Sequence, residues 1–203
     1  MAAQRRTSTD IALIAGFAAL IAACALLPAI QVGAGIVPIT LQTFAVLLAG
    51  AVLGARRGFL AVVLYVVVGA AGLPVFSGGA AGLAVLSGPT AGYIIGFPLA
   101  AALCGFLVER LPRGKIATSI PLIFACGLAG SAVFIHPLGM AGLVLRADLT
   151  WQQAFDIDKV FWIGDVIKNV AMALVATAVH RAFPDLLGRK GDTEPALPTH
   201  TAA

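Results

Sequence analysis

An acid and a base lie three positions apart inside an apolar stretch near the end of the chain. The segment Phe161–Val170 contains Asp165 and Lys168, and side chains at this spacing share one face of a helix. Either charge costs about 2.5–3.5 kcal/mol at the centre of a membrane helix on insertion scales. Two interpretations compete: the pair is a salt bridge that fixes the helix to its neighbours, or it lines a polar pocket that binds a small solute.

Polar side chains also gather at the start of an earlier apolar segment. The run Pro38–Thr43 offers hydroxyl groups and an amide, among them the side chains of Gln42 and Thr43. Because a polar group buried in an apolar setting needs a hydrogen-bond partner, we expect these groups to converge with Asp165 and Lys168 on one pocket.

The stretch 72–90 has an unusual composition for a connection between helices. It contains no charged residue and mixes glycines with Phe, Leu and Val. A solvated loop is normally more polar. The composition therefore predicts a lid that folds back over a bound solute, with Phe76, Gly78 and Gly79 inside it.

The whole chain is too apolar for a soluble globule. Of its 203 residues, 60% are hydrophobic and 11% are charged, whereas a soluble domain has roughly 25% charged residues. This balance excludes a soluble globule, a disordered chain and a nucleic-acid-binding protein. Because a helix needs about 20 apolar residues to cross a bilayer, we expect an all-α membrane protein whose transmembrane helices are Ile11–Ile30, Val37–Gly54, Phe59–Leu73, Ala91–Leu107, Ile116–Leu145 and Val160–Ala182, six in all. We expect a break in the fifth near His136.

The basic residues orient these helices. With six crossings, most of the 13 Lys and Arg residues fall on the side of the two termini, and Arg146 and Lys159 fall on the other. The positive-inside rule then makes both termini cytoplasmic. We expect a cytoplasmic segment 1–10, a substrate-binding transmembrane domain 11–182 and a disordered cytoplasmic tail 183–203. The acid–base pair then lies in the outer half of its helix, which favours a pocket open to the outside.

Motifs for catalysis or nucleotide binding are missing from the sequence. Gly114 and Lys115 lack the first glycine and the Ser or Thr of a P-loop. The three histidines, His136, His180 and His200, are far apart, and we expect a structural role for His136. Only one acid is expected at membrane depth, which disfavours an intramembrane protease. We expect no enzyme activity, no metal and no cofactor in this chain.

Five stretches, taken together, resemble the BioY family, the biotin-specific substrate-binding (S) components of energy-coupling-factor (ECF) transporters. The resemblance extends from about Ile11 to Ala182, and its motifs are Val37–Thr43, Leu47–Gly58, Gly72–Phe76, Gly88–Tyr93 and Gly164–Lys168.

The resemblance implies a six-helix S-component fold in the bacterial cytoplasmic membrane that binds biotin from the outside with high affinity. It further implies a transmembrane coupling subunit and a pair of ATPases supplied by other chains, so that ATP is used by the partners. Two alternatives stay open: an S component for another small vitamin, and a secondary transporter that works without an ATPase.

The resemblance also assigns residues. The Gly-Asp-x-x-Lys element maps onto Asp165 and Lys168 as ligand-binding residues. The carboxylate can accept from the ureido N–H groups of biotin, and Lys168 can donate either to the ureido oxygen or to the ligand carboxylate. We expect Phe76, Tyr93 and Trp162 to pack on the bicyclic ring.

The first helix carries a row of small residues at four-residue spacing, which lets helix backbones approach closely. The resemblance implies that these residues, Ala15, Ala19 and Ala23, dock on the coupling subunit.

Overall fold

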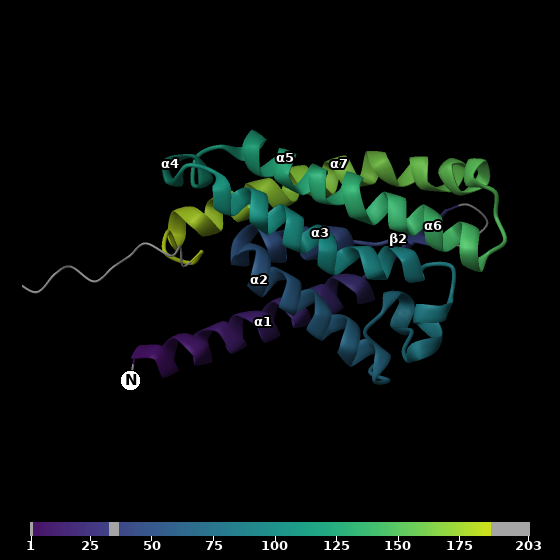
Figure 1. The fold of residues 1–203 in the computed structure, drawn as a ribbon, viewed down its shortest axis with the longest axis horizontal. Helices are drawn as coiled ribbons and strands as arrows, with labels where there is room; N and C mark the ends of the chain where they lie inside the picture. The colour runs from purple at the N-terminus through teal and green to yellow at the C-terminus, as the bar shows by residue number, and fades with distance from the viewer. Residues whose placement is uncertain (1, 33–36, 188–203) are drawn as a thin grey trace, which may run out of the picture.

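The computed structural model describes residues 2–32 and 37–187, and its fold is a bundle of helices (Figure 1). Within these residues, five helical stretches are long and apolar enough to cross a membrane. They are Thr7–Leu26, Gln42–Ala70, Ala91–Arg110, Ile120–Arg146 and Trp151–Ala182. These stretches agree with the predicted helical multi-pass fold, and one of them, Gln42–Ala70, reverses its direction.

Helix α1 (Ala2–Leu26) packs mainly against α2. Its inner side buries Ala18, Ile21 and Ala25. The helix ends four residues earlier than expected, two residues before Pro28, since proline commonly follows a helix end that it cannot continue.

A short antiparallel ribbon follows α1 and is the one exception to the all-α prediction in the described part of the chain. Strand β1 (Ile30–Val32) pairs with β2 (Val37–Ile39), with Ile30 opposite Ile39. The second helix was expected to begin at Val37 and in fact begins at Gln42. Stiff β-branched side chains around a proline favour an extended backbone there.

Helix α2 (Gln42–Ala70) consists of two antiparallel arms, 42–53 and 55–70. At Gly54 the backbone has φ 84° and ψ 178°, a conformation available almost only to glycine. The side-chain amide of Gln42 donates to the hydroxyl of Tyr65 at 2.6 Å, whereas these residues would be about 35 Å apart in a straight helix. The two arms correspond to the second and third helices expected from the sequence, but the second arm begins four residues before Phe59 and ends three residues before Leu73.

The connection after α2 folds back on the bundle. It contains two short helical turns, η1 (Ser77–Gly79) and η2 (Leu83–Ser87), and the backbone N–H of Gly82 donates to the carbonyl oxygen of Gly69 at 2.8 Å. Helix α3 (Ala91–Arg110) then runs through the centre of the bundle, where it packs closely against α2.

The next membrane-length stretch, Ile120–Arg146, consists of three consecutive helical elements preceded by a short turn. The turn α4 (Arg113–Ile116) leads into α5 (Ile120–Gly130), the π-helical segment η3 (Ser131–Ile135) and α6 (His136–Arg146). The expected break near His136 takes the form of this π-helical segment, because the wider turn accommodates a proline that cannot donate an N–H.

Helix α7 (Trp151–Ala182) begins nine residues before the expected start at Val160, so that prediction was wrong. Thr150 and Gln153 form a capping box, in which each side chain bonds to the other residue's backbone N–H. Polar residues in this first part lowered its hydropathy, and a hydropathy window therefore missed it. The earlier start places Asp158 inside the helix.

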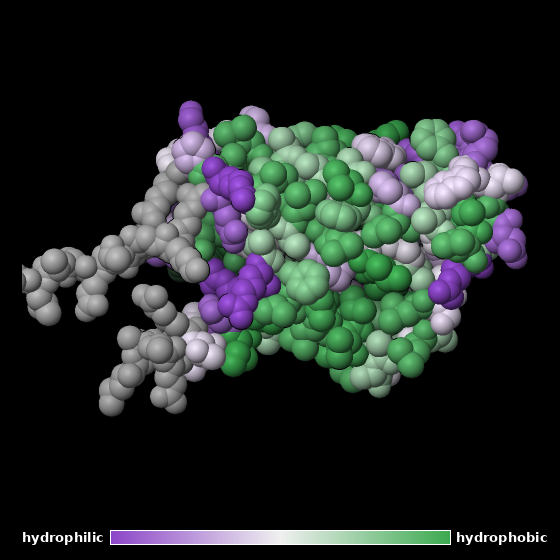
Figure 2. All heavy atoms as spheres, viewed as in Figure 1, coloured by the Kyte–Doolittle hydropathy of each residue, from purple (hydrophilic) through white to green (hydrophobic). Residues whose placement is uncertain are grey.

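The N-terminus of α1 and the end of α7 lie at the same end of the bundle, and β2 lies toward the opposite end (Figure 1). Figure 2 shows apolar side chains around the middle of the visible face, with hydrophilic residues at both ends. After α7, residues 183–187 form a turn, and Arg57 donates to the carbonyl oxygen of Leu186. The rest of the predicted tail, 188–203, lies outside the described residues.

Candidate functional site

A cavity of about 200 Å³ lies at the end of the bundle that holds β2 and the connection 71–90. Its walls come from β2, the start of α2, the folded-back connection, α3, α6 and α7. Six of the nine residues expected to bind substrate line this cavity: Gln42, Thr43, Phe76, Tyr93, Asp165 and Lys168. The other three expected residues, Gly78, Gly79 and Trp162, are not among the described residues that line the cavity.

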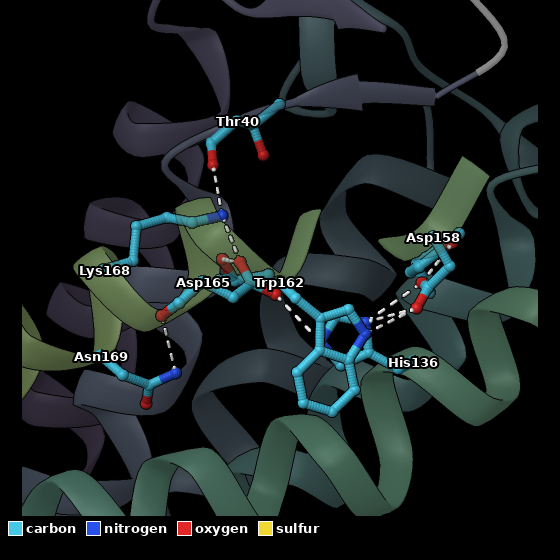
Figure 3. Close-up of polar contacts among 9 residues, drawn as sticks. Thr40, His136, Asp158, Trp162, Asp165, Lys168 and Asn169 are labelled. Atoms are coloured by element: carbon cyan, nitrogen blue, oxygen red, sulfur yellow. Dashed lines mark hydrogen bonds and ion pairs between the residues drawn. The ribbon is translucent and has the colours of Figure 1, made fainter. Parts of the chain in front are cut away.

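The acid–base pair of α7 is both an ion pair and part of the cavity wall. Lys168 Nζ lies 2.5 Å from Asp165 Oδ1, and the hydroxyl of Thr43 donates to the same oxygen at 3.1 Å. Lys168 also donates to the carbonyl oxygen of Thr40 at 3.2 Å, as Figure 3 shows. Asp165 is 3% exposed. The two competing interpretations of this pair are therefore compatible, since the paired groups still face a cavity.

A second buried carboxylate stands two helical turns before the first. Asp158 is fully buried and accepts from Tyr93 at 2.8 Å, from Trp162 at 3.1 Å and from His136 Nδ1 at 2.9 Å. The other ring nitrogen of His136 lies 3.3 Å from Asp165 Oδ2. Figure 3 shows the imidazole between the two acids. Three elements thus meet in one polar network.

Sequence reasoning missed Asp158. It counted a single acid in the last apolar segment, whereas α7 starts early enough to include Asp158 as a second buried acid. The structural role expected for His136 stays a prediction, to which the structure adds the contacts with both acids. The spacing of seven residues between Asp158 and Asp165 places both on one helix face, and this signal was present in the sequence. The contact between Asp158 and His136 could not be read from the sequence, because it joins α6 to α7 across the bundle.

The remaining walls are mostly apolar and include the folded-back connection. Phe76 is buried and meets the ring of Tyr65 edge to face, with centroids 5.6 Å apart. Gly69 makes room for this ring, since a Cβ there would lie 2.5 Å from Phe76 Cζ. Gly78 and Gly79 have φ of 68° and 77°, so they shape the turn beside Phe76.

The row of small residues on α1 faces away from the bundle. Ala15, Ala19 and Ala23 are all exposed, and a Cβ on neighbouring Gly16 would meet no atom within 4 Å. The row is therefore accessible to another helix.

The described residues contain no group of three or more His, Cys, Asp or Glu side chains that could hold a metal ion. The cavity instead combines a carboxylate acceptor, an ammonium donor, hydroxyls and an amide with apolar walls. This combination suits a small solute with an apolar ring and a polar edge.

Fold and cavity together define a class: a multi-pass helical membrane protein with a solute-binding pocket near one end. Three comparisons give the family. The BioY family profile matches residues 1–185. The chain is 40% identical to the "Biotin transporter BioY" of Rhizobium etli, over 90% of this chain and 99% of that protein, and 41% identical to that of Rhodobacter capsulatus, over 90% and 98%. The chain belongs to the BioY family.

A solved structure shares the fold. The crystal structure of the S-component for biotin from an ECF-type ABC transporter superposes with a TM-score of 0.80 and 26% sequence identity. The match covers 87% of this chain and 93% of that one. The expected S-component fold is thereby confirmed.

Proposed function

We propose that this chain binds biotin with high affinity and is the substrate-specific subunit of an ATP-driven ECF-type importer. The observation that carries the proposal is the ion pair of Asp165 and Lys168, which faces an otherwise largely apolar cavity in a chain of this family. The chain is a transport subunit and not an enzyme.

The chemistry of biotin suits this cavity. Its ureido ring has two N–H donors and one carbonyl, and an ionised Asp165 can only accept. Lys168 donates to the ureido oxygen or to the valerate carboxylate. Phe76 and Tyr93 supply apolar surface for the bicyclic ring, and Gln42 and Thr43 offer further polar contacts at the same wall. Charge-assisted hydrogen bonds in a site that excludes water give selectivity.

We propose six membrane crossings, with both termini in the cytoplasm of a bacterium and the cavity near the outer face. The reversal of α2 at Gly54 supports six, because each of its arms then crosses once. The start of α1 and the end of α7 lie at the same end of the bundle, and most basic residues of the sequence fall in the termini and the connections expected on that side. Both observations support the orientation.

We propose further that α1 docks through Ala15, Ala19 and Ala23 on the transmembrane coupling subunit, which joins the ATPase pair. The exposure of all three supports a contact with another helix. Hydrolysis of ATP by those partners then powers uptake.

The direct test is equilibrium binding of labelled biotin to the purified protein in detergent, with competition by unlabelled biotin and by other vitamins. Displacement by biotin alone supports the proposal, and displacement by another vitamin at lower concentration assigns a different substrate. Uptake by the lone chain in liposomes under an imposed ion gradient, without partner subunits, would instead show a secondary transporter.

A further inference from the structure

A buried carboxylate outside the cavity lining holds two of the residues that line it. Asp158 is 0% exposed and is not itself in the lining. It accepts from the hydroxyl of Tyr93 and from His136 Nδ1, and both of these side chains line the cavity. A buried ionised carboxylate is costly unless it is paired and hydrogen-bonded, so this arrangement needs an account beyond packing.

The imidazole of His136 is held at one edge and on one face. Asp158 holds its Nδ1, and the indole of Trp162 stacks on it with centroids 4.3 Å apart and planes 13° from parallel. Trp162 also donates to Asp158 at 3.1 Å. The remaining ring nitrogen therefore points in one direction, toward Asp165 Oδ2 at 3.3 Å.

That last contact is within ion-pair distance although it is not a hydrogen bond, and it favours a charged ring. In a neutral imidazole whose Nδ1 carries the proton, Nε2 is an acceptor and would face the carboxylate of Asp165, also an acceptor. An imidazolium places a donor there instead. It also balances the charges, because Asp158 and Asp165 then stand against His136 and Lys168 in a site where an unpaired charge is expensive.

We propose that Asp158 and His136 are a positioning pair: Asp158 holds the imidazolium of His136, which holds the Asp165 carboxylate in the orientation that accepts from the ligand. The inference rests on the proposed function and deepens it. The groups that face His136 are Asp158, Asp165 and Trp162 from α7, with Tyr93 of α3 reaching it through Asp158 and Lys168 through Asp165.

Trp162 provides a readout that needs no ligand. The chain has two tryptophans, so Trp151→Phe leaves Trp162 as the only indole. Its stacked ring senses the charge of His136 through a cation–π contact. Titration over about pH 5.5–9.5 should change its fluorescence. His136→Gln should remove this change, and His180→Gln should retain it, because His180 lies at the far end of α7 and contacts the carbonyl oxygen of Ala51.

Biotin affinity is then measured in the same variants over the same pH range. Wild type should bind more weakly as pH rises through the fluorescence transition. His136→Gln and Asp158→Asn should each weaken binding at least about tenfold at the acidic end, as loss of a hydrogen bond to a charged group does. His136→Gln should also flatten the pH profile, while His180→Gln should match wild type.

The outcomes separate the two proposals. Wild-type affinity and pH profile in His136→Gln would overturn the positioning role, as would an equal loss in His180→Gln. A normal fluorescence transition in a wild-type protein that binds no biotin at any pH would refute the proposed function, and the positioning role would fall with it. Thermal unfolding of each variant confirms that the compared proteins are folded.

Discussion

The ion pair of Asp165 and Lys168 provides the sharpest test. A purely structural salt bridge and a ligand-binding pair predict different results when both residues are replaced. We consider Lys168→Met, Asp165→Asn and the two together. Lys168→Met leaves Asp165, which is 3% exposed, without its partner at 2.5 Å. Breaking a buried pair costs about 3–5 kcal/mol of folding free energy. Since Thr43 and His136 still contact the carboxylate, we expect the lower end, about 3 kcal/mol.

The double variant removes both charges, so the folding free energy should return to within about 1 kcal/mol of wild type. Binding should not return. Each charged group lost from the ligand contact costs about 1.5–3 kcal/mol, which corresponds to an approximately 10- to 150-fold weaker affinity for biotin. The assay is denaturant unfolding in detergent combined with equilibrium biotin binding on the same four proteins.

A matched control lies on the same helix. Lys159 and Asp156 form an ion pair at the same spacing and at 2.6 Å, but their side chains are 55% and 47% exposed. Lys159→Met should leave the free energy of unfolding nearly unchanged, because exposed ion pairs contribute little to stability, and should leave biotin affinity unchanged. Recovery of both stability and affinity in the double variant would show that Asp165 and Lys168 form a purely structural salt bridge. That result would refute their role in binding the ligand.

Three further predictions concern other parts of the chain. Gly54→Ala should lower the free energy of unfolding by about 1–3 kcal/mol, because φ is 84° there. The control is Gly16→Ala, at an open position on α1. Equal unfolding curves for the two variants would contradict the reversal of α2. Ala19→Trp should preserve biotin binding yet impair uptake coupled to the ATPase partners, so unchanged uptake in reconstituted vesicles would exclude docking through this row. Thr150→Ala removes the capping box and should cost about 1 kcal/mol without changing affinity; a lower affinity would show that the start of α7 influences the cavity.

Several helices could be predicted because apolar residues dominate their length. The start of α3 at Ala91 and the end of α7 at Ala182 agree with the expected bounds. The start of α7 could not be obtained in this way, since its first turns are polar and depend on the cap formed by Thr150. Hydropathy measures lipid contact and not helix formation, so polar ends of membrane helices escape it.

The composition of the cavity was predictable only in part. Six expected residues line it. Four of them, Gln42, Thr43, Asp165 and Lys168, are polar residues in apolar segments, which are conspicuous in a sequence. Trp162 was expected against the ligand but stacks on His136 and lies outside the lining. Its spacing of three residues from Asp165 does not reveal on which side of the helix the indole will find space, since neighbouring helices decide that.

The amino-acid sequence alone determined the membrane class and the family resemblance, and it singled out Asp165 and Lys168, because charged residues are rare in apolar segments. Only the tertiary structure decided that His136 of α6 lies between two acids of α7. The physical reason is that contacts across a bundle depend on how helices are rotated and packed against each other, which the order of residues in one helix does not contain.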